Sequence, residues 1–193
     1  MLFPTRTIFA ALTIAATCRA QYTVSTVAGG ALTPTPASAL SSSLLQPSAV
    51  AVDSSGNQYF ISENGVFKIS ATGTLTRFAG VSTINGYSGD NGPAIDAALN
   101  QPAAIAFDSV GNLYIADTNN CRIRKVAVNG TISTIAGTGV SGFAGDGGPA
   151  INAELQHPGG VAIDSAENIY ISDSGNRRVS QSHDRRCDFY RGR

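Results

Sequence analysis

Three carboxylates recur along the chain at nearly equal intervals and are the first candidates for chemistry. Asp53, Asp108 and Asp164 each follow a short apolar run and precede a turn rich in polar residues. Carboxylates that converge on one point can hold a metal or act as an acid and a base. Each of these three, however, ends a strand candidate, where Asp serves the turn itself. We therefore expect no catalytic residue among them.

Metal sites are not predicted elsewhere either. The loops at Asp90 and Asp146 superficially resemble calcium loops. They lack the alternating oxygen ligands and the closing Glu that such a site requires, so turn chemistry explains them better. The two histidines, His157 and His183, have no partners at metal-ligand spacing. We expect no metal and no cofactor.

These residues belong to an internal repeat. The segment GDNGPAIDAALNQPAAIAFDSVGNLYIADTNNCRIRKV starts at Gly89, and GDGGPAINAELQHPGGVAIDSAENIYISDSGNRRV starts at Gly145. The two align without a gap, at a constant offset of 56 residues (89 to 145). A weaker copy, QPSAVAVDSSGNQYFISENGVFKIS, starts at Gln46 and lacks two residues near Asn64.

Each unit contains four short strand candidates. In the second unit these are AIAFD, NLYIAD, RIRKV and TISTIAG, and the Asn129-Gly130 pair between the last two is a strong hairpin signal. Helical periodicity is absent, apart from one possible turn at residues 149–155. Four antiparallel strands per repeat are typical of a β-propeller blade. The predicted fold is all-β, a partial propeller of about two and a half to three blades from a probable six-bladed ring.

The repeat predicts the following domain organisation. A signal peptide occupies 1–20, a degenerate first unit with a leading outer strand occupies 21–80, and a second unit occupies 81–137. An incomplete third unit occupies 138–180, and an aberrant tail occupies 181–193. A complete ring needs at least four blades, so the chain is expected to be a fragment with open sheet edges.

Three motifs carry a resemblance to a known family. They are the GDxGPAxxAxLxxP loop, the DSxGNLYIAD run, and D-[ST]-x-N-x-R-[IV] at 117–123 and 173–179. Over residues 24–179 the chain resembles the NHL-repeat β-propeller family, in its long-repeat, teneurin-like and bacterial exported variant. Many members have His before the motif Arg, whereas this chain has Cys121 and Arg177.

The residues of the last motif have two interpretations. Asp117, Asn120 and Arg122 could tie one hairpin to itself, with Arg122 bridging to a carboxylate, or they could contact a ligand. We favour the scaffold interpretation, and the residues that bind a ligand are unknown.

The resemblance implies a non-catalytic scaffold that binds a protein or a small ligand, with self-association through open sheet edges as a further possibility. An alternative is a propeller enzyme of the lyase or lactonase type. That chemistry needs convergent metal ligands, and His157 is the single histidine of the repeat region. Between Val24 and Val179 there are seven basic and eleven acidic side chains, which argues against a nucleic-acid partner.

The first residues predict export. Arg6 precedes the short apolar run 8–16, and Cys18 and Ala20 fit a cleavage site before Gln21. A buried N-terminal element is the alternative, and a lipid attachment at Cys18 fits poorly. The expected location is therefore secreted or periplasmic, with no membrane span.

The chain after Val179 departs from the repeat. The offset predicts a segment like RKVAVNGTISTIAG, but residues 180–193 read SQSHDRRCDFYRGR. A one-base shift within permitted codons turns residues 181–193 into Lys-Val-Thr-Thr-Asp-Gly-Ala-Ile-Ser-Thr-Val-Ala-Gly, which resembles the repeat. We hypothesise that the tail is out of frame. A truncated, non-functional product of a frameshifted gene is then an alternative to the binding scaffold. The alternative is a genuine basic tail. Because Cys187 lies there, we expect no disulfide with Cys121.

Overall fold

The computed structural model describes residues 37–38, 44–183 and 186–191. The predicted signal peptide (1–20) and the leading outer strand expected at 22–30 lie outside these residues. In the described part, no helix is long and apolar enough to cross a membrane.

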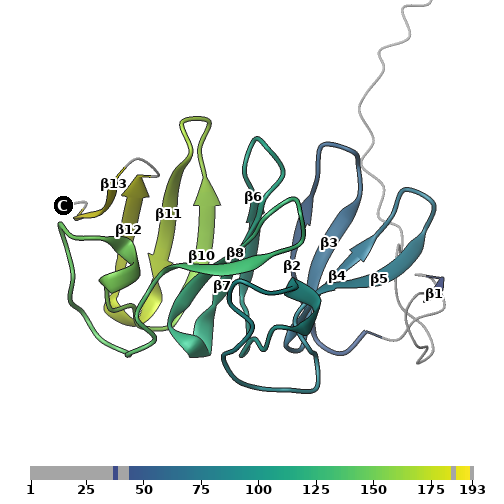
Figure 1. Ribbon diagram of the computed structural model, residues 1–193, viewed down its shortest axis with the longest axis horizontal. Coiled ribbons are helices and arrows are strands. Elements are labelled where there is room, and N and C mark those ends of the chain that lie inside the picture. Colours follow the sequence, from purple (N-terminus) through teal and green to yellow (C-terminus); the bar gives the residue numbers. More distant parts are fainter. Residues whose placement is uncertain (1–36, 39–43, 184–185, 192–193) are drawn as a thin grey trace, which may run out of the picture.

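Three antiparallel sheets follow one another along the chain (Figure 1). The first contains β2 (Pro47–Val52), β3 (Gln58–Ser62), β4 (Gly65–Ile69) and β5 (Thr74–Ala79), with β1 (Ala37–Ser38) added beside β5. The second contains β6 (Ala104–Phe107), β7 (Leu113–Asp117), β8 (Arg122–Val126) and β9 (Ile132–Ala136). The third contains β10 (Pro158–Ile163), β11 (Asn168–Asp173), β12 (Arg178–His183) and β13 (Arg186–Arg191).

The sheets pack face to face through two apolar cores. Strand β7 is buried along its whole length because alternate side chains point to opposite faces. Leu113 and Ile115 enter the core shared with the first sheet, while Tyr114 and Ala116 enter the core shared with the third. The first strands of the three sheets, β2, β6 and β10, pack beside one another. The expected partial propeller of four-stranded blades is confirmed, and the blade number of a full ring stays a prediction.

Short connections match the turn signals. The hairpin between β8 and β9 closes with a hydrogen bond from the Gly130 N–H to the Ala127 carbonyl at 2.8 Å. Single 3-10 turns, η2 (Ala94–Asp96) and η4 (Ala150–Asn152), form in the GPA segments, as expected for the second of them. Two further turns, η3 (Thr118–Asn120) and η5 (Ser174–Asn176), occupy the tight turns after β7 and β11.

The third sheet extends past residue 180. Strand β12 continues through His183, and β13 pairs with it in antiparallel register, with Ser180 opposite Arg191. The boundary between repeat and tail at residue 180, and the reading-frame hypothesis, stay predictions.

Candidate ligand-binding site

The long connections gather at one end of the sheets, which we call the long-loop face. Because neighbouring strands are antiparallel, β2, β6 and β10 begin at the end where β3, β7 and β11 finish. The segments 80–103 and 137–157, which join consecutive sheets, also lead to this end. The opposite end carries short hairpin turns, including those of the three recurring Asp residues.

Asp108 is held by its own turn at that opposite end. One carboxylate oxygen accepts hydrogen bonds from the backbone N–H groups of Val110 and Asn112, at 3.1 and 2.8 Å. The other accepts from the Asn112 amide at 2.6 Å and from the Tyr114 hydroxyl at 3.2 Å. The carboxylate therefore closes the turn and ties it to β7.

Asp53 and Asp164 repeat this arrangement in the other two sheets. Each accepts hydrogen bonds from two backbone N–H groups, an Asn amide and a Tyr hydroxyl of its own turn. Burial, together with the charge and hydrogen bond of Asp53, raises the pKa of Tyr59 to about 12. The expectation that the recurring carboxylates serve turns is confirmed.

Asp108→Asn should destabilise the protein by roughly 1–3 kcal/mol at pH 7 and by less at about pH 3. Burial disfavours the ionised form, but hydrogen bonds from Asn112 and Tyr114 and the charge of Lys125 outweigh it, so the pKa of Asp108 lies below its ordinary value. A lowered pKa means that the stabilisation is complete above the unfolded-state pKa and is lost as the pH falls through the folded-state pKa. Urea unfolding of both proteins at the two pH values tests this, and an equal loss at both would contradict it.

Asp117 is the centre of a second cluster, on the long-loop face. Its side chain is fully buried at the end of β7. One carboxylate oxygen accepts from the backbone N–H of Asn100 at 2.8 Å, and the other accepts from the Asn120 amide at 2.8 Å and from Arg124 at 3.3 Å. These contacts show that Asp117 and Asn120 tie the hairpin to itself, as the scaffold interpretation expects.

The expectation that Arg122 bridges to a carboxylate is wrong. Its guanidinium donates to the backbone carbonyls of Asn120 and Thr138 and lies 3.8 Å from the ring centre of Tyr87. Arg122 opens β8 at its partly exposed end, so it reaches the loop after β9. Arg124 lies two residues further along the same face of the strand, where it reaches the buried Asp117 and the partly buried Asp90.

Arg124 joins the loop at 87–90 to the end of β7. Its side chain is 0% exposed and forms ion pairs with Asp90 at 2.6 Å and with Asp117 at 3.3 Å. It also donates to the Ser88 carbonyl at 3.0 Å, while the Tyr87 hydroxyl donates to Asp90 at 2.7 Å. Sequence reasoning missed this residue, which organises the long-loop face of the second sheet.

The two carboxylates beside Arg124 differ in acidity. Burial raises the pKa of Asp117 and outweighs the hydrogen bonds that it accepts from Asn120 and other donors. Burial acts in the same direction on Asp90, but hydrogen bonds that include one from Thr134, together with the charge of Arg124, bring the pKa of Asp90 below its ordinary value. Asp90 is therefore the more acidic partner of the arginine.

The third sheet builds the same cluster from a different arginine. Arg178, which opens β12, forms ion pairs with Asp173 at 2.8 Å and with Asp146 at 2.9 Å. Ser180, which is buried, stands at the place that Arg124 has in the second sheet. The carboxylate bridge expected of the motif arginine is thus present in the third unit.

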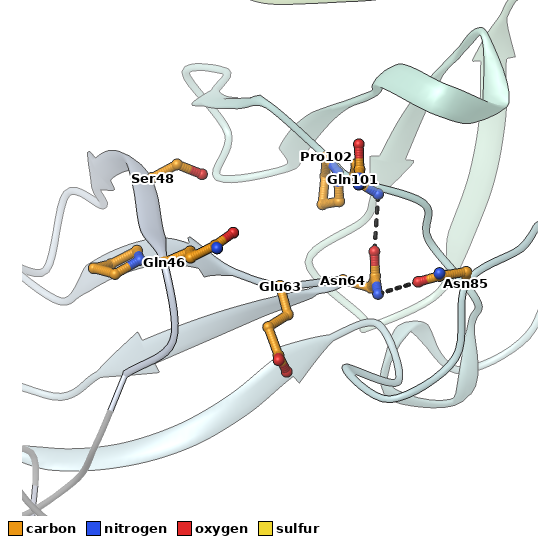
Figure 2. Close-up of a pocket in the computed structure, with 8 residues that line it drawn as sticks. Gln46, Ser48, Glu63, Asn64, Asn85, Gln101 and Pro102 are labelled. Atoms are coloured by element: carbon orange, nitrogen blue, oxygen red, sulfur yellow. Dashed lines mark hydrogen bonds between the residues drawn. The ribbon is translucent and has the colours of Figure 1, made fainter.

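An open pocket of about 560 Å³ lies on the long-loop face between the first two sheets (Figure 2). Its lining consists of Gln46, Pro47, Ser48, Glu63, Asn64, Asn85, Gln101 and Pro102. Carboxamides dominate this set, and Glu63 is its single charged member. The pocket therefore presents a neutral, hydrogen-bonding surface with one carboxylate, whose side chain extends away from Ser48 and Pro102 (Figure 2).

Asn64 fixes the floor of the pocket. Its amide donates to the side-chain oxygen of Asn85 at 2.5 Å and to the Ser82 carbonyl at 3.3 Å. Its own oxygen accepts from the backbone N–H of Gln101 at 2.9 Å. Asn64 thus links the first sheet to the segment that leads into β6.

The pocket exists where the first unit has the shorter turn. In the second unit, Asn119 of η3 donates its backbone N–H to the Asn100 carbonyl at 3.1 Å and its amide to the Gln101 side chain at 2.9 Å. The backbone of η5 makes the equivalent bond in the third unit. The turn at 62–65 lacks the two residues of such a cover. The Ser62 hydroxyl donates to the Leu45 carbonyl at 2.5 Å, but the Gln46 side chain has no such partner among the described residues.

The residues before the first strand of each sheet have an unusual backbone. Gln46, Gln101 and His157 have φ values of 45°, 46° and 49°, and each precedes a proline. This left-handed region is disfavoured for a residue with a side chain, and a following proline restricts it further. Strain of this kind collects at ligand-binding sites, and two of the three residues line the pocket.

The described part of the chain contains no group of three or more His, Cys, Asp or Glu residues placed to hold a metal ion. The prediction of no metal and no cofactor stays a prediction.

Comparisons with known proteins agree with this architecture. A family model for the teneurin NHL domain matches residues 84–141, and a model for the NHL repeat matches residues 155–181. Human Teneurin-4 is 37% identical over 100 residues, which cover 45% of this chain and 4% of Teneurin-4. NHL repeat-containing protein 2 of Bos taurus is 32% identical over 117 residues, which cover 55% of this chain and 16% of that protein.

Solved structures share the fold. A protein of unknown function from Bacteroides thetaiotaomicron matches with a TM-score of 0.57 at 24% identity, over 65% of this chain and 32% of that one. A streptogramin B lyase matches with a TM-score of 0.52 at 17% identity, over 76% of this chain and 41% of that one. At these identities the likeness concerns the fold alone. The family-model matches identify residues 84–141 and 155–181 as NHL-type repeats, and the three four-stranded sheets agree with the blades of an NHL-repeat propeller.

Proposed function

We propose that this protein is an exported, non-catalytic scaffold that binds a ligand on its long-loop face. The observation that carries this proposal is the pocket between the first two sheets, at the place where two residues are missing from the turn after β3. A pocket of about 560 Å³ falls within the ordinary size range of small-molecule sites. Its lining offers donors and acceptors that have no partner among the described residues.

The lining favours binding over catalysis. Glu63 is its one ionisable side chain, and its carboxylate extends away from Ser48 and Pro102 (Figure 2). General acid–base chemistry needs groups with matched pKa values within hydrogen-bond reach of the reacting atoms. Amides and a hydroxyl hold a ligand without supplying such groups.

Export is the other half of the proposal. The positive and apolar character of residues 1–16 and the small residues before Gln21 support a secreted or periplasmic location. The acidic body supports a neutral or basic ligand, or a protein, rather than a nucleic acid. Self-association through open sheet edges is a further part of the proposal, although the outer edge of β9 already pairs at Ile132 with the segment 91–94.

A binding screen tests the function. The protein, expressed from its full sequence, is immobilised and presented with neutral glycans, short neutral peptides and nucleotides, while the solution is analysed for products. We expect reversible binding of a neutral ligand without turnover, weakened by Asn85→Ala in the pocket. Conversion of a bound compound, or binding that this substitution leaves unchanged, would contradict the proposal.

A further inference from the structure

We propose that the pocket between β2 and β6 is a carbohydrate site for one or two neutral sugar rings. This inference rests on the proposed binding function and names its ligand class. Four features of the pocket carry it: the unused hydrogen-bonding groups, the charge of the lining, the two prolines, and the fixed backbone of the two glutamines.

The unused hydrogen-bonding groups suit vicinal hydroxyls. Among the described residues, the side chains of Gln46 and Ser48 have no hydrogen-bond partner, and Asn85 keeps its amide N–H donors after accepting from Asn64. The Gln101 side chain accepts from Asn119 and likewise keeps its donors. A carboxamide presents a donor and an acceptor in one plane, so it can pair with two neighbouring hydroxyls of a sugar ring.

The charge of the lining selects a neutral ligand. None of the eight lining residues is Lys or Arg, the side chains that bind phosphate, sulfate or carboxylate groups. The carboxylate of Glu63 at the margin accepts from hydroxyls and repels anions. An acidic sugar or a nucleotide would therefore be disfavoured.

The two prolines favour a sugar over an extended peptide as the ligand. An extended peptide gains affinity by pairing with the backbone of a sheet edge, but Pro47 and Pro102 have no N–H to donate where β2 and the segment before β6 border the pocket. The ring of Pro47, which is exposed, instead offers apolar surface on which the C–H face of a pyranose can rest, whereas Pro102 is buried. Both positions therefore disfavour a peptide strand, and Pro47 in addition suits a sugar ring.

The backbone of the two glutamines fixes the points from which their side chains extend into the pocket. Gln46 and Gln101 have φ values of 45° and 46°, and the N–H of Gln101 is tied to Asn64 at 2.9 Å. A backbone that is already fixed adds no ordering cost of its own when a ligand binds. The floor of the site is thus prepared before the sugar arrives.

Calorimetric titration with cellobiose, maltose and lactose tests the inference. We expect at least one of these neutral disaccharides to bind, and Gln101→Ala to weaken that binding by about tenfold. Gln58→Ala, a matched control at the far end of β3, should leave it unchanged. Replacement of the turn 62–65 by the longer turn 117–122 should abolish binding because it restores the missing cover.

Several outcomes would overturn the sugar site. They are no binding by any of the three disaccharides, equal binding of 6′-sialyllactose, and sugar binding that survives both pocket changes. Circular dichroism and thermal unfolding confirm that each variant is folded, and Gln101→Ala remains informative if the longer turn disrupts folding. If a neutral peptide binds the pocket in place of sugars, the scaffold function stands and the carbohydrate inference fails. Turnover of a ligand would instead remove the scaffold function.

Discussion

Arg124→Met should lower the free energy of unfolding by about 3–5 kcal/mol, the loss typical of removing one partner from a buried ion pair. The arginine is completely buried between Asp90 and Asp117, with N–O distances of 2.6 and 3.3 Å. Methionine fills a similar volume but leaves the Asp117 carboxylate buried without its cation. Urea denaturation followed by circular dichroism measures the change in midpoint.

A second substitution separates charge from packing. Arg124→Met combined with Asp117→Asn should be less destabilised than Arg124→Met alone, because Asn carries no charge into the interior. Arg77→Met on β5 is the matched control: this arginine is partly exposed and has no ion pair among the described residues. A loss in Arg124→Met no larger than that in Arg77→Met would show that the ion pairs do not stabilise the fold.

Arg124→Met should also disturb the candidate binding site. The segment 84–92 contributes Asn85 to the pocket, and Arg124 holds this segment through Asp90 and the Ser88 carbonyl. Without the arginine, Asn85 would keep its bond to Asn64 but lose the anchor that follows it in sequence. The ion-pair cluster therefore belongs to the architecture that positions the candidate site.

The repeat made the sheets and the hairpin turns predictable. The offset of 56 residues located the strands. The position of Asp108 between a strand candidate and a polar segment indicated a turn, and the partners of Asp108 indeed lie within six residues. Interactions within one hairpin can be read from sequence in this way. The two-residue gap near Asn64 was also visible in the sequence, but the pocket that lies beside it in the structure was not predicted.

The pocket and the Arg124 cluster depend on contacts between segments far apart in sequence. Arg124 and Asp90 are separated by 34 residues, and Gln101 and Asn64 by 37. Motif spacing identified Arg122 because it recurs as Arg178, yet Arg124 has Ser180 as its counterpart and left no repeated signal. The aromatic pair Tyr87 and Phe143 does recur at the repeat offset. Tyr87 lies against Arg122 and Phe143 lies against Arg178. The recurring aromatic residue was therefore the available sign that these loops pack onto the arginine-bearing strands.

Gly137→Ala should destabilise the protein by about 2–4 kcal/mol, through two additive causes. The glycine has a φ of 93°, which disfavours any residue with a Cβ. A Cβ there would also overlap with the backbone carbonyl oxygen of Cys121 and crowd Arg122 at 3.0 Å. Because backbone atoms cannot swing aside, the strand end must move.

Gly130→Ala separates these two causes. Gly130 has a similar φ of 83°, but a Cβ at this hairpin would meet nothing within 4 Å. Its substitution should therefore cost only the backbone strain, about 1–2 kcal/mol. The difference between the two variants in urea denaturation measures the clash itself. Equal losses would mean that β9 shifts freely at Gly137. In that case the hydrogen bond from Gly137 to Ala150, at 2.9 Å, does not fix the start of the loop 137–157.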